Sequence, residues 1–474
     1  MAKTVQDILR FIGENEVEMV DFKMVDIDGQ FRHVTIPARN FSEETLANGV
    51  GFDASNYGYA TVEKSDMVFI PDPDTAIIDP FCGVPTLSMT GDAMIIDRPT
   101  NRPLAQYPRN IVRAAERYMR DSGVADAMMI LPEFEFYLFD SVSWSVKHEQ
   151  ISMSLNATQA WWNSDSLWDG GVVPLQKAYH VAKPFDRTYE CRSEMCLEMQ
   201  KAGIAINYHH PEVGSAGQFE IEPMLGQMSK MADAAMMIKY IVRNVALRHG
   251  LSATFMPKPV YGEAGSGMHV HMLLLKDGAP VFSDDAGYAC LSKTAHYFMG
   301  GLLKHIASLC ALTNPSTNSF KRLVPGFEAP VTVGYATSNR SAVIRIPAYA
   351  KTPELRRFEL RNPDATCNPY FCFAAILMAG LDGVKNEIDP HENGWGPYDV
   401  DLYHLPEEEK AKLTSLPTSL EAALDALERD HDYLTAGGVF PEALLRTFIA
   451  AKRRECREIM AIPHPAEFER YYNL

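Results

Sequence analysis

Charged and imidazole side chains recur at two-residue spacing inside four apolar segments of this chain. They are Glu133 and Glu135 in LPEFEFYLFD, Glu220 and Glu222 in QFEIEPM, His269 and His271 in GSGMHVHMLLL, and Arg357, Glu359 and Arg361 in RRFELRNPD. Side chains alternate between the two faces of a β-strand, so the members of each pair are expected on one face, roughly 7 Å apart. The residues between them are Phe, Ile, Val and Leu, which predicts strands embedded in the protein.

A single pair of this kind is most often the polar face of a half-buried strand. Four such segments in one chain are better explained by a shared site. Carboxylates hold Mg²⁺ or Mn²⁺, and imidazole favours the latter. Guanidinium groups pair bidentately with carboxylate and phosphate oxygens. The residues alone therefore predict two-metal phosphoryl transfer on a carboxylate or phosphate substrate.

Two further segments add arginines to this set. NSFKRLVPGFEAP contains Arg322 and Glu328, and NRSAVIRIP contains Arg340 and Arg345. The glycine and prolines of the first segment predict a loop at the mouth of a site. An arginine on a loop is usually solvated, so these residues carry weight only together with the four strands.

The local patterns predict an α+β protein of two parts. The chain has 474 residues, enough for two or three domains. Residues 1–102 are interpreted as a small domain, with a helix capped by Thr4 and a hairpin in VEMVDFKMVDIDGQFRHVTIP whose turn is Asp28-Gly29. Residues 103–474 form the second part.

The second part is predicted to begin and end with helices. Pro108 starts and Gly123 ends a segment with apolar residues at helical spacing. LEAALDALERDHDYL and PEALLRTFIAAKRRECREIM, near the C-terminus, are amphipathic at the same spacing.

The net charge of −17 disfavours two classes of partner. An acidic surface repels phosphate backbones and anionic lipids. We therefore expect neither a nucleic acid nor a membrane as a partner. The N-terminus has no apolar stretch of signal-peptide length, and no window reaches the ~18 apolar residues of a membrane span. The eight cysteines show no metal-site spacing and are expected to be reduced thiols. A cytoplasmic protein is expected.

Taken together, the motifs resemble those of glutamine synthetase type I, the bacterial glutamate–ammonia ligase family, along nearly the whole chain. The matching strings are GFDASN, SDM, PEFEFYLFD, RSEMC, HHPEVGSAGQFE, FMPKPVYGEAGSGMHVH, NSFKRLVPGFEAPV, NRSAVIRIP, RRFELRNPDATCNPY and HPAEFERYY. The resemblance implies a β-grasp-like N-terminal domain and a large catalytic domain. The latter would contain a curved antiparallel sheet, an open barrel, flanked by helices.

The resemblance also implies two or more divalent ions per active site, Mg²⁺ or Mn²⁺, with ATP as co-substrate. The ligands would be Glu135, Glu212 and Glu220 for an ion that positions glutamate, and Glu133, His269 and Glu359 for an ion that bridges ATP phosphates.

Further roles follow from the same resemblance. Arg322, Arg361 and the backbone of Gly265 would bind glutamate, Arg340 and Arg345 the transferring phosphoryl group, and His271 and Arg357 the nucleotide. Tyr179, Asp53 and Glu328 would form the ammonium pocket, with Asp53 as general base and Glu328 on a loop that shields the intermediate. Asp53 would come from a neighbouring subunit of a dodecamer of two stacked six-membered rings.

The implied reaction joins ammonia to L-glutamate through γ-glutamyl phosphate, with release of ADP and phosphate. Several positions depart from the usual family pattern: Ala54, Asn56, Leu225, Ala264 and Leu273. Tyr403 lies in a segment similar to one that carries a modified tyrosine in some members.

Three alternatives stay open at this stage. A sister ligase would join glutamate to a polyamine or ethanolamine, but such relatives tend to lose the acidic pocket, which is kept here. A catalytically silent regulatory paralogue should have broken metal ligands, and none is broken. A metal-dependent hydrolase on a barrel-like fold leaves the arginines unexplained.

Overall fold

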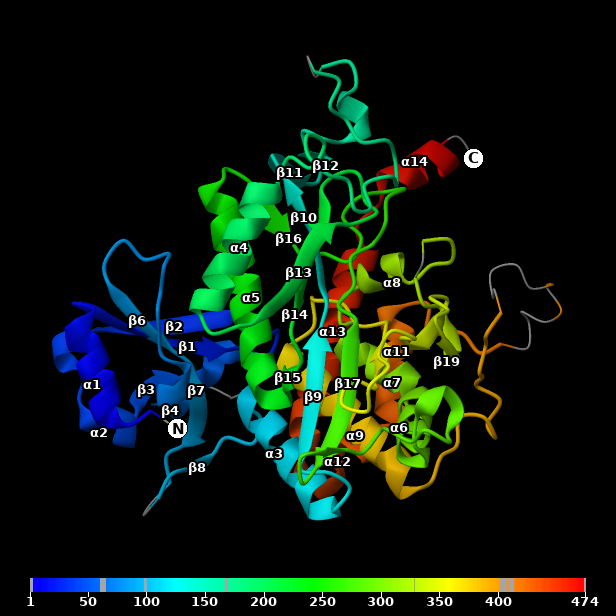
Figure 1. Cartoon of the computed structure of the whole chain (residues 1–474). Helices are drawn as coiled ribbons and strands as arrows, with labels where there is room; N and C mark the ends of the chain where they lie inside the picture. Colours follow the sequence, from blue (N-terminus) through cyan, green and yellow to red (C-terminus); the bar gives the residue numbers. More distant parts are fainter. Residues whose placement is uncertain are drawn as a thin grey trace.

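The computed structural model describes residues 3–59, 65–97, 100–166, 169–327, 329–400, 406, 408 and 413–472. A small β-rich N-terminal part lies beside a larger α+β part (Figure 1). Among the described residues, none of the helices combines the length and apolarity that a bilayer crossing requires.

The N-terminal part contains the capped helix and the hairpin that the sequence predicts. In α1 (Val5–Glu14) the Thr4 hydroxyl accepts from the Asp7 N–H at 3.2 Å, and Asp7 accepts from the Thr4 N–H at 2.8 Å. The strands β1 (Met19–Val25) and β2 (Phe31–Pro37) pair antiparallel around Gly29, which has a φ of +75°.

Two four-stranded sheets and one short helix complete this part. One sheet has the order β2-β1-β6-β5, with β5 (Ile77–Ile78) and β6 (Thr86–Met89). The other has the order β3-β4-β7-β8, with β3 (Val50–Asp53), β4 (Asp66–Pro71), β7 (Gly91–Ile95) and β8 (Arg102–Pro103). The helix is α2 (Glu43–Asn48). The boundary between residues 102 and 103 stays a prediction.

Two open sheets form the centre of the larger part. The seven-stranded sheet consists of β15 (Gly226–Gln227), β9 (Ala127–Pro132), β17 (Val270–Lys276), β21 (Phe358–Leu360), β20 (Ala342–Ile346) and β19 (Thr332–Thr337), with β18 (Ala279–Pro280) beside β17. The four-stranded sheet consists of β13 (Ile206–Pro211), β14 (Gln218–Pro223), β10 (Phe134–Phe139) and β16 (Ser252–Thr254). Only β19 and β20 pair parallel among these strands, and the described strand path does not close into a barrel.

The chain passes from one sheet to the other at Glu133. The sequence predicts one strand through Glu133 and Glu135, and in this detail it is wrong, because β9 ends at Pro132 and β10 begins at Phe134. The Glu133 N–H donates to the His269 carbonyl at 2.9 Å, which keeps the backbone paired across the junction. Both glutamates therefore lie where the sheets meet.

Helices cover these sheets and form most of the apolar core. They are α3 (Pro108–Ser122), α4 (Tyr189–Lys201), α5 (Met228–Arg248), α6 (Lys293–Lys304), α7 (Ile306–Thr313), α8 (Ser319–Arg322), α9 (Pro369–Lys385), α11 (Leu420–Arg429), α12 (Asp432–Thr435), α13 (Glu442–Met460) and α14 (Pro465–Tyr471). The helix α9 is buried along nearly its whole length, with α3, α5, α6 and α7 packed against it. The predicted α3 and the C-terminal helices are confirmed.

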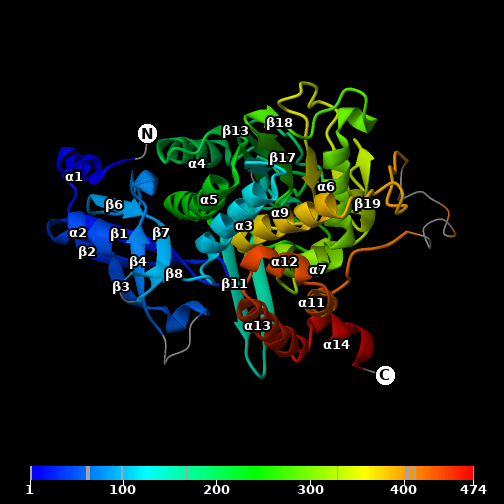
Figure 2. The same ribbon diagram turned by 90° about the horizontal axis from the view of Figure 1, so that it is seen from below.

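A two-stranded hairpin extends away from the body of the molecule (Figure 2). It consists of β11 (Ser141–Val146) and β12 (Ile151–Asn156). Its apolar side chains Trp144 and Met153 are 75% and 68% exposed. A hairpin of this kind is marginally stable on its own in water, so these side chains are a surface that another element could cover.

A buried arginine joins the two parts of the chain. Arg109, on α3, donates to Asp72 at 2.6 Å and Asp92 at 3.1 Å in the N-terminal part, and to Asp233 of α5 at 2.9 Å. A second close approach involves Gly29 of the hairpin, where an added Cβ would lie 2.8 Å from the Asn368 Cα, just before α9. The N-terminal part is therefore firmly attached to the helices that support the site.

Candidate active site

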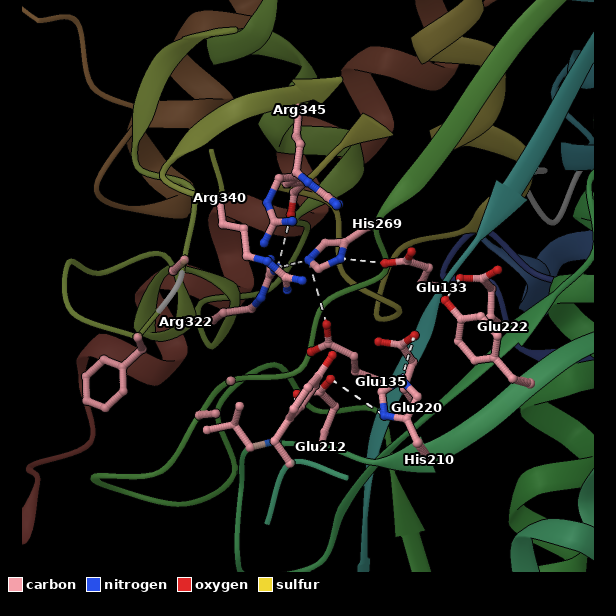
Figure 3. A pocket seen from close by; sticks show the side chains of 18 of the residues that line it. Glu133, Glu135, His210, Glu212, Glu220, Glu222, His269, Arg322, Arg340 and Arg345 are labelled. Carbon is pink, nitrogen blue, oxygen red and sulfur yellow. Dashed lines mark hydrogen bonds and ion pairs between the residues drawn. The ribbon is translucent and has the colours of Figure 1, made fainter. Parts of the chain in front are cut away.

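A cavity of about 720 Å³ opens where the two sheets of the larger part meet. Its walls bring together fourteen of the residues that the sequence singled out: Glu133, Glu135, Tyr179, Glu212, Glu220, Glu222, Ala264, Gly265, His269, Arg322, Arg340, Arg345, Arg357 and Arg361. Figure 3 shows the labelled glutamates on one side of the cavity and the labelled arginines on the other, with His269 between them. The cavity thus offers cation ligands and anion-binding groups face to face.

Two glutamates with unusual ionisation, Glu212 and Glu220, lie on the acidic side. Burial, together with the charges of Glu135 and Glu220, raises the pKa of Glu212 to about 8. Burial and the charges of Glu133 and Glu135 raise the pKa of Glu220 well above its usual range. Carboxylates that repel one another in this way favour a bound cation, which would offset both desolvation and repulsion.

His210 stands between two of these glutamates. Its Nε2 lies 3.5 Å from Glu220 Oε1, and its Nδ1 lies 3.9 Å from Glu212 Oε1. The three side chains can place one ligand atom each within 4.8 Å of one another, which suits a divalent ion. Glu135, which the family resemblance implies as a ligand here, accepts from the Gly267 N–H at 2.8 Å and faces His269 Nε2 at 3.7 Å.

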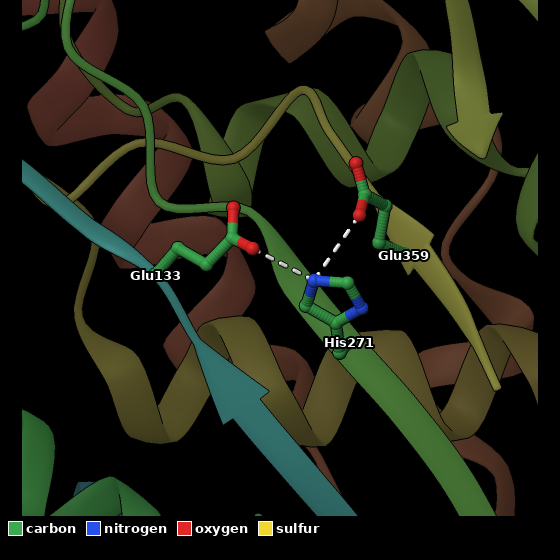
Figure 4. A group of neighbouring side chains, drawn as sticks. All are labelled: Glu133, His271 and Glu359. Atoms are coloured by element: carbon green, nitrogen blue, oxygen red, sulfur yellow. Dashed lines mark hydrogen bonds and ion pairs between the residues drawn. The ribbon is translucent and has the colours of Figure 1, made fainter. Parts of the chain in front are cut away.

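A second group of ligands lies deeper, around Glu133 (Figure 4). Glu133 Oε1 lies 2.8 Å from His271 Nε2, and His271 Nε2 lies 3.1 Å from Glu359 Oε2. His269 Nδ1 lies 2.8 Å from Glu133 Oε2. Burial opposes ionisation of Glu359, but the charges of His271 and Arg361 outweigh it and lower its pKa to about 2.

This second group also suits a metal ion, because Glu133, His271 and Glu359 bring their ligand atoms within 4.8 Å of one another. Oxygen and imidazole donors are the set expected for Mg²⁺ or Mn²⁺. His271 takes the place in this group that the resemblance gives to His269, which lines the cavity instead.

The arginines are held by neighbours that fix their direction. Arg345 donates to Glu359 at 2.8 Å, and Arg361 donates to the other oxygen of Glu359 at 2.6 Å. Arg322 donates to the backbone carbonyls of Asn362 at 2.8 Å and Arg361 at 3.0 Å. Buried guanidinium groups fixed in this way suit binding of a carboxylate or phosphate.

A glycine allows the chain to approach Arg322 closely. A Cβ on Gly265 would lie 2.6 Å from Arg322 Cγ and 2.7 Å from the Pro257 carbonyl oxygen. A side chain there would displace both, so the backbone of this segment is free to face the cavity.

Comparison with known proteins decides which family this geometry belongs to. Residues 16–95 match the family described as glutamine synthetase, beta-Grasp domain, and residues 105–471 match glutamine synthetase, catalytic domain. The chain belongs to the glutamine synthetase family. It is 43% identical to a glutamine synthetase of Mycolicibacterium smegmatis, covering 100% of this chain and 99% of that protein. It is 44% identical to a glutamine synthetase of Salmonella typhimurium, covering 99% and 100%.

A solved structure agrees with this membership. The chain is similar to the Plasmodium falciparum glutamine synthetase, with a TM-score of 0.88 and 26% identity over 99% of both chains. The expected family and fold class, with a β-grasp domain and an open antiparallel sheet, are thereby confirmed.

Three residues expected at a glutamine synthetase site, Asp53, His271 and Glu359, are not among the described residues that line the cavity. Asp53 is at the exposed end of β3, apart from the described residues that line the cavity of its own chain. His271 and Glu359 are buried behind the wall. Glu328 and Tyr403 lie outside the described residues.

The sequence reasoning missed His210 as a residue of the site. His210 and Glu212 repeat the two-residue spacing that identified the other pairs, so the signal was present. Pro211 between them interrupted the apolar pattern on which that reasoning relied. In the structure, β13 pairs with β14 so that His210 lies opposite Glu220, which places His210 in the site.

Proposed function

We propose that this chain catalyses the ATP-dependent ligation of ammonia to L-glutamate, giving L-glutamine, ADP and phosphate. The observation that carries the proposal is the single cavity in which carboxylates and imidazoles face five arginines. Full-length relatives at 43% and 44% identity support the same activity.

The arginines would hold the two anionic reactants together. We assign Arg322 and Arg361, with the backbone of Gly265, to the carboxylates of glutamate. Arg340 and Arg345 would stabilise the charge on the transferring phosphoryl group. We assign Arg357 and His271 to the nucleotide site, with His271 buried behind its wall. A glutamate γ-carboxylate oxygen then attacks the terminal phosphorus, ADP leaves, and an acyl phosphate results.

The donor sets described above fit divalent ions. We assign Glu135, Glu212 and Glu220 to one Mg²⁺ or Mn²⁺ ion, and Glu133, His269 and Glu359 to another. The nearby His210 and His271 are further candidate ligands. Bound divalent ions would supply Lewis-acid neutralisation of the phosphate charge.

The second step requires neutral ammonia. Tyr179 lies on the wall of the cavity, and its side chain hydrogen-bonds to Arg340. We assign Asp53 of a neighbouring chain, together with Tyr179 and Glu328, to the ammonium pocket. Asp53 would accept the proton that ammonium releases, since only neutral ammonia can attack the acyl carbon and expel phosphate. Hydrogen bonds from Ser55 and Ser65 lower the pKa of Asp53, which keeps it ionised to attract the cation.

We further propose a dodecamer of two stacked rings, located in the cytoplasm. The exposed Trp144 and Met153 of the β11–β12 hairpin, and Met460 and Tyr472 near the C-terminus, are apolar surfaces suited to contacts between copies. The eight cysteines are all unpaired, which suits a reducing compartment. The mass of the assembly in solution tests the first point.

The deciding experiment follows phosphate release from ATP, Mg²⁺ and glutamate with ammonium or with ethanolamine and a polyamine. Ammonium-dependent release, with glutamine confirmed by mass, is expected. Release only with a larger amine would reassign the chain to ligation of that amine, and no turnover with any nucleophile would overturn the proposal.

A further inference from the structure

Lys258 covers an aromatic ring at the mouth of the cavity. Its Nζ lies 3.7 Å from the centroid of the Phe327 ring. Phe327 lines the cavity together with Gly326 and Ala329. A cation at this distance is attracted by the negative face of the ring, and withdrawal of the ammonium from water strengthens the contact.

The lysine itself is fixed by the rest of the site. Its N–H donates to Asn318 Oδ1 at 2.7 Å, and Asn318 Nδ2 donates to the Lys258 carbonyl at 3.1 Å. Its Nζ also donates to the backbone carbonyl of Glu263. Glu263 directly precedes Ala264 and Gly265 in the cavity wall. The side chain of Lys258 thus connects the Gly265 segment to Phe327.

Phe327 lies on a turn in a loop beside the cavity. It lies in the loop between α8 and β19, directly after Gly326, whose φ of +97° turns the chain sharply. Its ring is half-buried, between the cavity and Lys258. Loop segments open with less free energy than core strands or helices, so losing the Lys258 contact favours displacement of Phe327.

We propose that Lys258 is a positioning residue that holds Phe327 over the cavity and so keeps water from the acyl phosphate. This inference rests on the proposed ligase function. When Phe327 is displaced, water attacks the acyl phosphate in place of ammonia. Phosphate then leaves and glutamate is regenerated, so ATP is consumed without glutamine formation.

The test measures phosphate and glutamine together in the full-length protein. In Lys258→Met and Phe327→Leu, glutamate-dependent phosphate release without ammonium is expected to rise about tenfold, the factor that a desolvated cation–π contact supplies. Lys258→Arg keeps a cation and Phe327→Tyr keeps a ring. In both variants ATP consumption is expected to stay coupled to glutamine formation. Lys321→Met removes an exposed lysine near the same loop and is the matched control.

A double-mutant cycle separates the contact from other roles of Lys258. If the contact acts as proposed, Lys258→Met combined with Phe327→Leu is no more uncoupled than either single variant. The inference would be overturned if the two substitutions raised ammonium-independent phosphate release additively. It would also be overturned if Phe327→Leu coupled ATP consumption to glutamine formation as tightly as the wild type.

A second measurement does not depend on turnover. Limited proteolysis of the segment from 324 to 329 is expected to be faster in Lys258→Met than in Lys321→Met. An inactive wild type with this difference would defeat the ligase proposal but leave the Lys258 contact standing, whereas equal cleavage would defeat the contact itself.

Discussion

Glu220 lies among carboxylates that repel one another, and this makes its neutral replacement informative. The Glu220→Gln variant replaces a carboxyl group whose ionisation is opposed by burial and by neighbouring carboxylates, so without metal it is expected to be at least as stable as the wild type. Mn²⁺ at a hundred times its dissociation constant stabilises a protein that binds it by about 2.7 kcal/mol. We expect Glu220→Gln to lose most of this gain in thermal unfolding.

The control for this prediction is the same substitution at a glutamate away from the cavity. Glu194, on α4, pairs with Arg248 at 3.0 Å and His249 at 2.7 Å. Glu194→Gln is expected to keep the full Mn²⁺ response. An unchanged response in Glu220→Gln would show that the ion is held elsewhere.

At the residue scale, spacing in the sequence predicted most of the cavity wall. It worked because each pair lies on or beside a strand, where alternate residues share a face. It could not show that Glu133 binds both His269 and His271, since that depends on the sheet junction. It also could not place Lys258 over Phe327, because no pattern links a lysine to a ring in a distant loop.

At the scale of elements, one imidazole connects three helices. His305, between α6 and α7, has Nδ1 2.8 Å from Asp430 after α11 and Nε2 2.9 Å from Asp382 of α9. The pKa of Asp382 is about 2, lowered mainly by its hydrogen bond to His305, so this carboxylate can only accept. With an aspartate at each ring nitrogen, both nitrogens donate when the imidazole is protonated, and the ring stacks on Tyr433.

This arrangement predicts how stability depends on pH. Burial and the charge of Lys304 oppose protonation of His305, but the bonds to Asp382 and Asp430 outweigh them and raise its pKa. A raised pKa contributes stability that is complete below about pH 6.5 and is lost as pH rises through the folded-state value. His305→Gln is expected to lower the free energy of unfolding in urea by about 2 kcal/mol at pH 6 and by less at pH 9.

The matched control is a histidine paired at the surface. His249→Gln breaks only the contact with Glu194 and is expected to cost less than about 1 kcal/mol at pH 6. A cost of His305→Gln that stays constant between the two pH values would argue against a charged imidazole at that position.

Local sequence signals predicted those helices whose ends carry capping residues. Thr4 with Asp7 and Pro108 with Gly123 fix the ends of α1 and α3 through short-range bonds that a sequence displays. Pro132, just before Glu133, signals an interruption there, but the sequence does not show that β9 and β10 pair with strands of different sheets.

At the scale of the whole molecule, Arg109 joins the two parts of the chain. Its side chain is 7% exposed and pairs with three aspartates. Arg109→Met removes a buried cation shared by three aspartates, of which Asp72 and Asp92 keep only the more exposed Arg113, and is expected to lower the free energy of unfolding by about 3–5 kcal/mol in urea. We also expect the N-terminal part to unfold in a separate, earlier transition.

Arg113 provides a control on the same helix. It pairs with Asp72 and Asp92 too, but its side chain is 41% exposed. Arg113→Met is expected to cost about 1 kcal/mol or less. If both variants lost the same free energy of unfolding, burial would not distinguish the two arginines.

The attachment of the two parts could not be predicted from the sequence. Arg109 appears there as one polar residue at the start of an amphipathic helix. Its partner Asp233 is 124 residues away along the chain, and nothing local marks the pair. Length predicted two or three domains and local patterns predicted two parts, but the contacts between these parts arise only on folding.

The place of Asp53, outside the cavity of its own chain, has a genetic consequence under the assignment proposed above. Each working site would combine the cavity of one copy with Asp53 of the next. Two alleles, one carrying Asp53→Asn and the other Glu220→Gln, would each be inactive alone. Expressed together in equal amounts, they would restore about a quarter of the sites, because a ring built from both contains neighbours that contribute two intact halves.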